Sequence, residues 1–363
     1  MKPLLRHLAL FSSIALLGCA HLPLAPAPGP APVLSQTHLR SPWEAAPVAL
    51  TTQPYNCPPL APISPDILVT NGVGAQKKVS DTVQQAVYAE SDAALHELSA
   101  RSVAAADNFR HTGSQAAARC VIILLSNAAA DHSMAGYMAT EDAAQEQNLA
   151  LCSVAIAYLK VRDSGLATPD EADLIGAWME DIARQERNRI ESTACGKTYC
   201  ELKAHEGLSI AMASAAVGVA ANDPSMLHWA IAQYRTAVAG IDGRGMLHFD
   251  THGAYALKFN LLSAAALVQI AEFAETNGEP LYAYDGGRIH LLIRTVSRGL
   301  IDPGPYVSAA GIEQHLPSSL EPWQVIWAAV YNRRFPDPVL TGLLQQIGPR
   351  GDDMWGGEPI DGA

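Results

Sequence analysis

The stretch from Tyr255 to Pro303 constrains the fold more than any other part of the chain. It begins as an apolar run with helical spacing and ends at Thr276-Asn277-Gly278-Glu279-Pro280, where a left-handed cap residue is followed by a helix breaker. A second helix is expected to restart near Asp285. Its apolar side chains recur at helical intervals and should face a core, namely Ile289, Leu291, Leu292, Val296 and Leu300. The pattern predicts two consecutive helices joined by a short connection.

The rest of the chain favours helices in the same way. The sequence is rich in alanine, 49% apolar and low in aromatic residues, and few of its runs alternate with a period of two. Thr168-Pro169-Asp170-Glu171 is typical of a helix start, because it combines a Thr cap, Pro in the first turn and acids at the positive end of the helix dipole. We predict an all-α single domain of about ten to twelve helices, as counted from such breaks and periodic runs.

The first residues read as an export signal, with Lys2 and Arg6 before an apolar run over residues 8–17. Leu16-Leu17-Gly18-Cys19 resembles a bacterial lipobox, in which the cysteine becomes the lipidated first residue; the alternative is an ordinary signal peptide that contains a cysteine. Ala20 would direct an outer-membrane anchor. We therefore expect a signal peptide over 1–18, a lipidated Cys19 with a Pro/Ala-rich tether over 19–50, a folded domain over 51–363, and an exported, periplasmic protein held at the outer membrane.

Apart from Cys19, the chain has five cysteines, and export to an oxidising compartment makes disulfides plausible. Cys195 and Cys200 flank a four-residue segment and could close a small loop, or they could remain free thiols. Cys152 lies in an apolar helical run and is expected to be a small buried side chain. The His and Cys spacings do not match those of metal ligands, so the sequence predicts neither a metal nor another cofactor.

The chain is acidic, with a formal net charge of −12. This charge argues against nucleic acid as a general partner, since nucleic-acid binding needs basic surfaces. Basic residues do occur locally, as at Lys77-Lys78 and from Lys197 to Lys203. Each of these groups is either a solvated surface or a binding site for an anion.

Several motifs resemble, in order along the chain, the alginate lyase family with the helical toroid fold (polysaccharide lyase family 5, mannuronate-specific lyases). They are Tyr55-Asn56-Cys57-Pro58, the pair Lys77-Lys78 before Ser80-Asp81-Thr82, the block from Tyr255 to Pro303, and Trp355-Gly356-Gly357. The resemblance covers Tyr55 to about Gly357. It implies an incomplete (α/α) toroid of antiparallel helix pairs, a monomer, and a disulfide between Cys57 and Cys120.

The resemblance also implies the reaction, which is β-elimination at a uronic acid of an anionic, alginate- or mannuronan-like polysaccharide. A base removes the C5 proton while cations or hydrogen-bond donors neutralise the C6 carboxylate, and an acid protonates the leaving O4 oxygen. His205, in Lys203-Ala204-His205, matches the family's catalytic histidine. We assign it to proton abstraction or to holding the carboxylate. No cofactor is expected.

The chain departs from the family pattern at three catalytic positions. Ala204 replaces an asparagine, Tyr255 stands where an arginine belongs, and Leu262 stands where the family has its catalytic tyrosine. These replacements define an alternative, a catalytically inactive polysaccharide-binding or exopolysaccharide-assembly protein on the same scaffold.

Nearby residues could compensate for these replacements. Tyr255 and Lys258 are three positions apart and so share a helix face, which makes Tyr255 a candidate acid/base; the alternative is a packing residue at a helix start. Lys203 or Lys258 could neutralise the substrate carboxylate, and His252 adds an imidazole nearby. The substrate-binding residues expected from the sequence are Lys77, Lys78, Lys203, Lys258, Asn260 and His252.

Overall fold

The computed structural model describes residues 38–66, 82–136, 138, 141–193, 204–348 and 351–359. The predictions that fall outside these residues are those for the signal peptide, Cys19, Lys77, Lys78, Cys195, Cys200 and Lys203.

Helices make up the regular structure of the described residues, which contain isolated β-bridges but no strand. In chain order the elements are η1 (Pro42–Ala45), α1 (Thr82–Thr112), α2 (Gln115–Ala130), α3 (Glu141–Arg162), α4 (Pro169–Thr193), α5 (Ala204–Ala220), α6 (Pro224–Ala239), η3 (His248–Asp250), η4 (Gly253–Tyr255), α7 (Ala256–Thr276), η5 (Leu281–Gly287), α8 (Ile289–Gly299), α9 (Gly304–Ala310), α10 (Pro322–Val325), α11 (Ala328–Arg334), α12 (Pro338–Ile347) and η6 (Asp353–Trp355).

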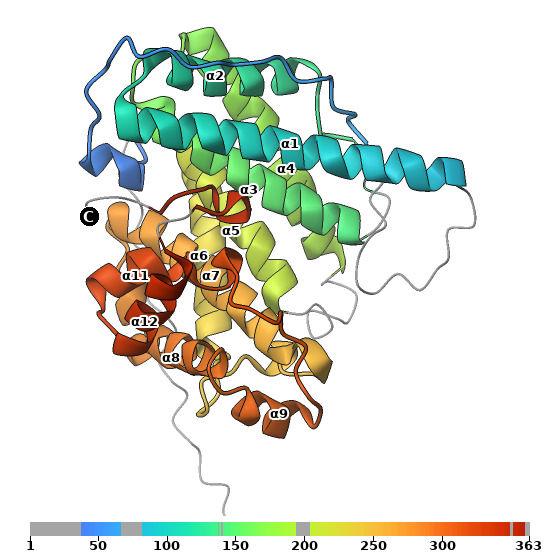
Figure 1. The fold of residues 1–363 in the computed structure, drawn as a ribbon, viewed down its shortest axis with the longest axis vertical. Helices are drawn as coiled ribbons and strands as arrows, with labels where there is room; N and C mark the ends of the chain where they lie inside the picture. The colour runs from blue at the N-terminus through green and yellow to red at the C-terminus, as the bar shows by residue number, and fades with distance from the viewer. Residues whose placement is uncertain are drawn as a thin grey trace, which may run out of the picture. The chain divides into compact units, whose positions relative to one another are not determined.

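The long helices are arranged as successive hairpins. Short connections join α1 to α2, α3 to α4 and α5 to α6, and a longer one that contains η5 joins α7 to α8, so the two helices of each pair run antiparallel. The first helices of the pairs pack on one another in the order α1, α3, α5, α7, and the chain progresses from α1 and α2 at one end of the view to α8 and α12 at the other (Figure 1). This confirms the all-α prediction and gives the incomplete (α/α) toroid.

The helix α5 forms the centre of the core. Its side chains from Leu208 to Ala220 are all buried, mostly alanine and other small residues, and it packs against α3, α4, α6 and α7. A Cβ atom at Gly218 would lie 2.9 Å from the backbone nitrogen of Leu227, so glycine is required where α6 begins its close approach. The segment Gly253–Thr276 is apolar and long enough to cross a membrane by composition, but 67% of its most apolar window is buried inside the fold, as expected of a core helix.

The predicted break between α7 and α8 is present. Gly278 adopts a left-handed φ of 88°, and the backbone N–H of Glu279 donates to the carbonyl of Ala274 at 2.9 Å, which closes the helix end. The next helix begins at Ile289 rather than near Asp285, because Asp285 itself has a positive φ of 49° within the turn η5. Ile289, Leu292 and Val296 are buried as predicted, while Leu291 and Leu300 are only half-buried.

The described residues before residue 51, 38–50, are part of the folded unit. Leu39 is fully buried, and its N–H donates to the side chain of Asn222 at 2.7 Å. The Asn277 side chain bonds both the N–H and the carbonyl of Arg40. The described part of the expected tether over 19–50 is therefore packed on the domain, and the boundary lies upstream of residue 51.

Two further contacts fix the ends of the domain. A disulfide joins Cys57 to Cys120 in α2, the pair that the family resemblance implies. The ammonium of Lys160 is buried, pairs with Asp107, and donates to the carbonyls of Gly356 and Glu358 at 2.7 and 3.0 Å. The C-terminal segment is thereby held against α1 and α3.

Candidate active site

His205 lies in the first turn of α5 and is held by a carboxylate. Its Nδ1 is 2.9 Å from Oδ1 of Asp250, and its backbone N–H donates to the same oxygen at 3.2 Å. Asp250 ends the short turn η3, is fully buried, and accepts the hydroxyl of Ser263 on its other oxygen. A carboxylate at Nδ1 favours the tautomer with the proton on Nδ1, which leaves Nε2 as a proton acceptor.

The other ring nitrogen of His205, Nε2, is not bound by Asp250. The side chain is 7% exposed, and within the described residues no hydrogen-bond partner faces Nε2. The ring of Phe259 stacks on the imidazole with the centroids 4.1 Å apart and the planes within 5°. The stacking and the Asp250 bond fix the orientation of the imidazole.

Tyr255 lies at the N-terminus of α7 and also contacts Phe259. Its ring is 6.0 Å from that of Phe259 and meets the ring of His315 edge-on at 5.2 Å. It is half-buried, so its phenol can contact both protein and solvent. The two predicted catalytic residues, His205 and Tyr255, are thus brought into one cluster with Phe259 between them.

Lys258 adds a positive charge to this cluster. Its Nζ lies 6.0 Å from the centre of the Tyr255 ring and 5.9 Å from that of Trp323, a geometry in which aromatic faces attract a cation. The indole N–H of Trp323 donates to Glu321 at 2.7 Å, which orients the ring. The Lys258 side chain is half-buried, so its ammonium remains accessible to an anionic group.

Asn260 does not fit its predicted role in substrate binding. The side chain is fully buried, its oxygen accepts the N–H of Leu247 at 2.8 Å, and its nitrogen donates to the carbonyl of Ala256 at 3.0 Å. The same nitrogen also donates to the hydroxyl of Thr251 at 3.4 Å. Asn260 therefore holds the loop that carries Asp250, and the prediction is corrected to a positioning role.

His252 lies in this same loop but points outward. It is exposed, and its ring meets that of His248 edge-on at a centroid distance of 5.3 Å. The following turn leads directly to Tyr255. A substrate contact by His252 stays a prediction.

Another tyrosine near Asp250 is unsuited to acid–base work. Tyr306 is fully buried, and burial together with the carboxylates of Asp242 and Asp250 raises its pKa well above the usual range. Such a phenol stays protonated and out of contact with a polymer. Tyr255 is the phenol of this cluster that reaches the surface.

Sequence reasoning did not find two parts of the cluster. The sequence assigned no role to Asp250, because its bond to His205 crosses 45 positions of the chain. His315 comes from a segment without regular structure that closes on the start of α7, where its N–H donates to the carbonyl of Ala254 at 2.6 Å. Nothing in the local sequence around His315 signals this contact.

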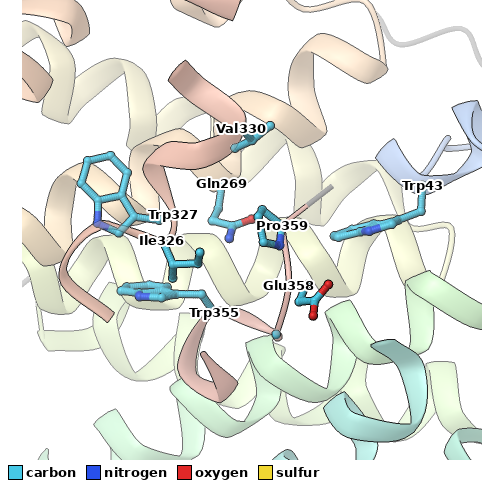
Figure 2. Close-up of a pocket in the computed structure, with 9 residues that line it drawn as sticks. Trp43, Gln269, Ile326, Trp327, Val330, Trp355, Glu358 and Pro359 are labelled. Atoms are coloured by element: carbon cyan, nitrogen blue, oxygen red, sulfur yellow. The ribbon is translucent and has the colours of Figure 1, made fainter. Parts of the chain in front are cut away.

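Two other places in the described structure offer weaker support for a functional site. Figure 2 shows Trp43, Trp327 and Trp355 around a cavity of about 20 Å³, which has room for on the order of one water molecule. Among the described residues, His38, Glu44 and Asp163 bring possible metal-ligand atoms within 4.8 Å of one another. Both carboxylates of that group already pair with Arg162, so it is better described as an ion-pair network.

The fold defines the class of protein, an all-helical (α/α) toroid. The family model described as alginate lyase matches residues 46–305, and the chain belongs to that family.

Curated relatives carry the same description. An alginate lyase of Azotobacter chroococcum mcd 1 is 28% identical over 222 residues, which cover 58% of this chain and 56% of that protein. An alginate lyase of Azotobacter vinelandii is 27% identical over 219 residues, with the same coverage. The matched stretch thus spans a little over half the length of these relatives.

Solved structures extend the likeness over most of the fold. Alginate lyase A1-III from Sphingomonas species A1 superposes with a TM-score of 0.67 at 17% identity, covering 89% of this chain and 90% of that one. A tyrosine-to-phenylalanine variant of alginate lyase A1-III, complexed with a tetrasaccharide, gives a TM-score of 0.71 at 18% identity, covering 88% of each chain. At such identities the likeness establishes the fold, which is the (α/α) toroid.

Proposed function

We propose that this protein is a polysaccharide lyase that cleaves a uronate-containing, alginate- or mannuronan-like polysaccharide by β-elimination. Membership of the alginate lyase family supports the reaction class. The observation that carries the proposal is the pairing of His205 with Asp250 in a cluster that also holds Phe259, Tyr255 and Lys258.

Each group then has a role in the elimination. Nε2 of His205 accepts the C5 proton or a hydrogen bond from the substrate, and Asp250 stabilises the imidazolium that proton transfer would create. The ammonium of Lys258 neutralises the C6 carboxylate, which stabilises the charge that develops as the C5 proton leaves. The phenol of Tyr255 donates its proton to the departing O4 oxygen.

These roles replace the missing family residues with groups from the same helix face. Leu262 occupies the family's tyrosine position, and the phenol is supplied instead by Tyr255 at the beginning of α7. Lys258 lies one turn further along and provides the cation that an arginine would have provided. The roles require only side chains of this chain, in keeping with a reaction that needs no cofactor.

Formation of an unsaturated uronate tests the proposal, because elimination creates a double bond conjugated with the carboxyl group. The absorbance of this product in the ultraviolet should rise on at least one of mannuronan, guluronan and glucuronan. The rise should fall by about 10²–10⁴-fold in His205→Ala, the range typical of one general acid or base. Binding of these polymers without any rise in absorbance would identify an inactive polysaccharide-binding protein instead.

We further propose that the protein acts from a lipid anchor in the periplasm. Support comes from the sequence Leu16-Leu17-Gly18-Cys19, which precedes a Pro/Ala-rich stretch. Membrane fractionation of a Cys19→Ser variant tests this proposal. The variant should leave the membrane fraction, and an unchanged distribution would refute the anchor.

A further inference from the structure

The N-terminus of α7 lacks a capping side chain of its own. The first backbone N–H groups of a helix have no partner within the helix, and a Ser, Thr, Asp or Asn at the N-cap usually accepts from one of them. In α7 the N-cap residue is Tyr255, whose side chain makes no such bond. A phenol therefore stands at the position where a short polar side chain would close the helix end.

A glutamine from a distant part of the chain supplies the missing cap. Gln314 lies 57 positions after Leu257, in the connection between α9 and α10, and its Oε1 accepts the N–H of Leu257 at 3.0 Å. This N–H belongs to the second residue of α7, one of the groups that an N-cap side chain normally binds. Gln314 thus closes the helix end in place of the Tyr255 side chain.

The same connection also holds the residues before Tyr255. The side-chain nitrogen of Gln314 donates to the carbonyl of Gly253 at 3.2 Å. The next residue, His315, donates its backbone N–H to the carbonyl of Ala254 at 2.6 Å, and its ring meets the Tyr255 ring edge-on. Two consecutive residues of one loop therefore bond the backbone on both sides of Tyr255.

The turn that carries Tyr255 has little support from the side chains just before it. Gly253 has a positive φ of 68°, and no atom of the described residues lies within 4 Å of the place where a Cβ would stand. The side chain of His252, which begins the turn η4, makes no capping bond. A loose turn would matter for the reaction, because a misplacement of about 1 Å can cost about 10²-fold in rate.

We propose that Gln314 is a positioning residue for the phenol of Tyr255. It acts by capping α7 and by bonding the turn that leads into the helix. The inference rests on the proposed function, in which Tyr255 protonates the departing O4 oxygen. The arrangement leaves the N-cap position to a phenol while the helix end stays capped.

Kinetics of Gln314→Met test this role, because methionine has a similar length but no N–H donor and only a weak acceptor. We expect kcat to fall on the order of tenfold with KM near the wild-type value, since Lys258 and His205 are unchanged. The same substitution in Tyr255→Phe should cause no further loss, because the phenol is already absent. Gln345→Met, at an exposed glutamine of α12, is the matched control and should behave as wild type.

Amide hydrogen exchange tests the cap without any turnover. In full-length Gln314→Met, a peptide that covers residues 253–262 should exchange roughly fivefold faster or more than in wild type. The reason is that the N–H of Leu257 loses its acceptor, so the first turn of α7 opens more often. The Gln345→Met control should keep the wild-type exchange rate in this peptide.

Four results would overturn the proposal. They are unchanged exchange over residues 253–262 in Gln314→Met, a change in KM alone, an equal loss of kcat with and without the Tyr255 hydroxyl, and full activity in Tyr255→Phe. The proposed function fails separately, if wild-type protein forms no unsaturated product from any uronate polymer. In that case faster exchange in Gln314→Met would retain Gln314 as the residue that positions Tyr255, and unchanged exchange would remove it.

Discussion

At the scale of single residues, the state of His205 depends on the buried carboxylate next to it. Asp250 accepts from both the ring and the backbone of His205, and Ser263 fixes its other oxygen. An imidazole without this partner could adopt the other tautomer, with the proton on Nε2, and it would then be unable to accept one from a substrate. Phe259 fixes the ring plane but has no influence on the proton.

Replacement of Asp250 with asparagine should therefore lower kcat by about 10²–10⁴-fold, because the amide no longer stabilises a protonated His205. Steady-state kinetics on the preferred polymer would measure the loss, and circular dichroism would show whether the fold is retained. Asp131→Asn is the matched control and should behave as wild type. Full activity in a folded Asp250→Asn variant would contradict the proposal that His205 acts as an acid or base supported by Asp250.

The sequence predicted part of this cluster. His205, Tyr255 and Lys258 could be proposed because the first matches a family motif and the other two share a helix face. The role of Asp250 could not, since it depends on how a loop folds over α5. Asn260 was misassigned because an amide on the face of a catalytic helix looks the same in sequence whether it meets substrate or a backbone N–H.

At the scale of elements, helix ends were predicted better than the connections between them. Gly278 closes α7 as expected, because local backbone conformation decides such a cap. The turn η5 delays α8 to Ile289, and the left-handed Asp285 responsible for this stands in Asp285-Gly286-Gly287, a turn signal that the prediction did not use. The packing of Leu39 and Arg40 was missed for another reason, since their partners Asn222 and Asn277 lie far along the chain.

The start of α4 yields a prediction about pH. Glu171 accepts two hydrogen bonds from Arg119, each of 2.8 Å, and one from the backbone N–H of Thr168. These bonds lower the pKa of Glu171 from 4.5 to about 2, with the Arg119 bond as the main cause. Because the folded-state pKa is depressed, the stabilisation is present above pH 4.5 and is lost as the pH falls toward 2.

Urea unfolding of Glu171→Gln and wild type at several pH values would measure this effect. The variant should be less stable near neutral pH, and the difference should shrink as the pH falls through the window between the two pKa values. Asp170→Asn, one position earlier in the same turn, is the control and should show a smaller difference. A difference that does not change with pH would contradict the role assigned to the Arg119 pair.

At the scale of the whole molecule, the toroid places the ends of separate helices at one site. The inner helices α5 and α7 start next to His205 and Tyr255. The arrangement therefore depends on how the helix pairs are held together. The disulfide between Cys57 and Cys120 contributes by closing a loop of 63 residues that includes α1.

Loss of this disulfide should destabilise the domain by about 2–4 kcal/mol, the usual effect of a cross-link on the unfolded chain. Thermal unfolding of Cys57→Ser would show the loss as a lowered Tm. Wild-type protein in reductant should unfold at the same temperature as the variant in reductant. Identical Tm values for oxidised wild type and Cys57→Ser would contradict a stabilising role.

The central claim is that a uronate polymer is cleaved by elimination at the cluster of His205, Tyr255 and Lys258. The masses of the oligosaccharide products test it most directly, because elimination adds no water to the bond that is broken and hydrolysis adds one. We predict that wild-type protein releases oligosaccharides with an unsaturated non-reducing end, which are one water lighter than hydrolytic fragments, and that His205→Ala releases almost none. Products of hydrolytic mass alone, or equal release by the folded His205→Ala variant, would contradict this account.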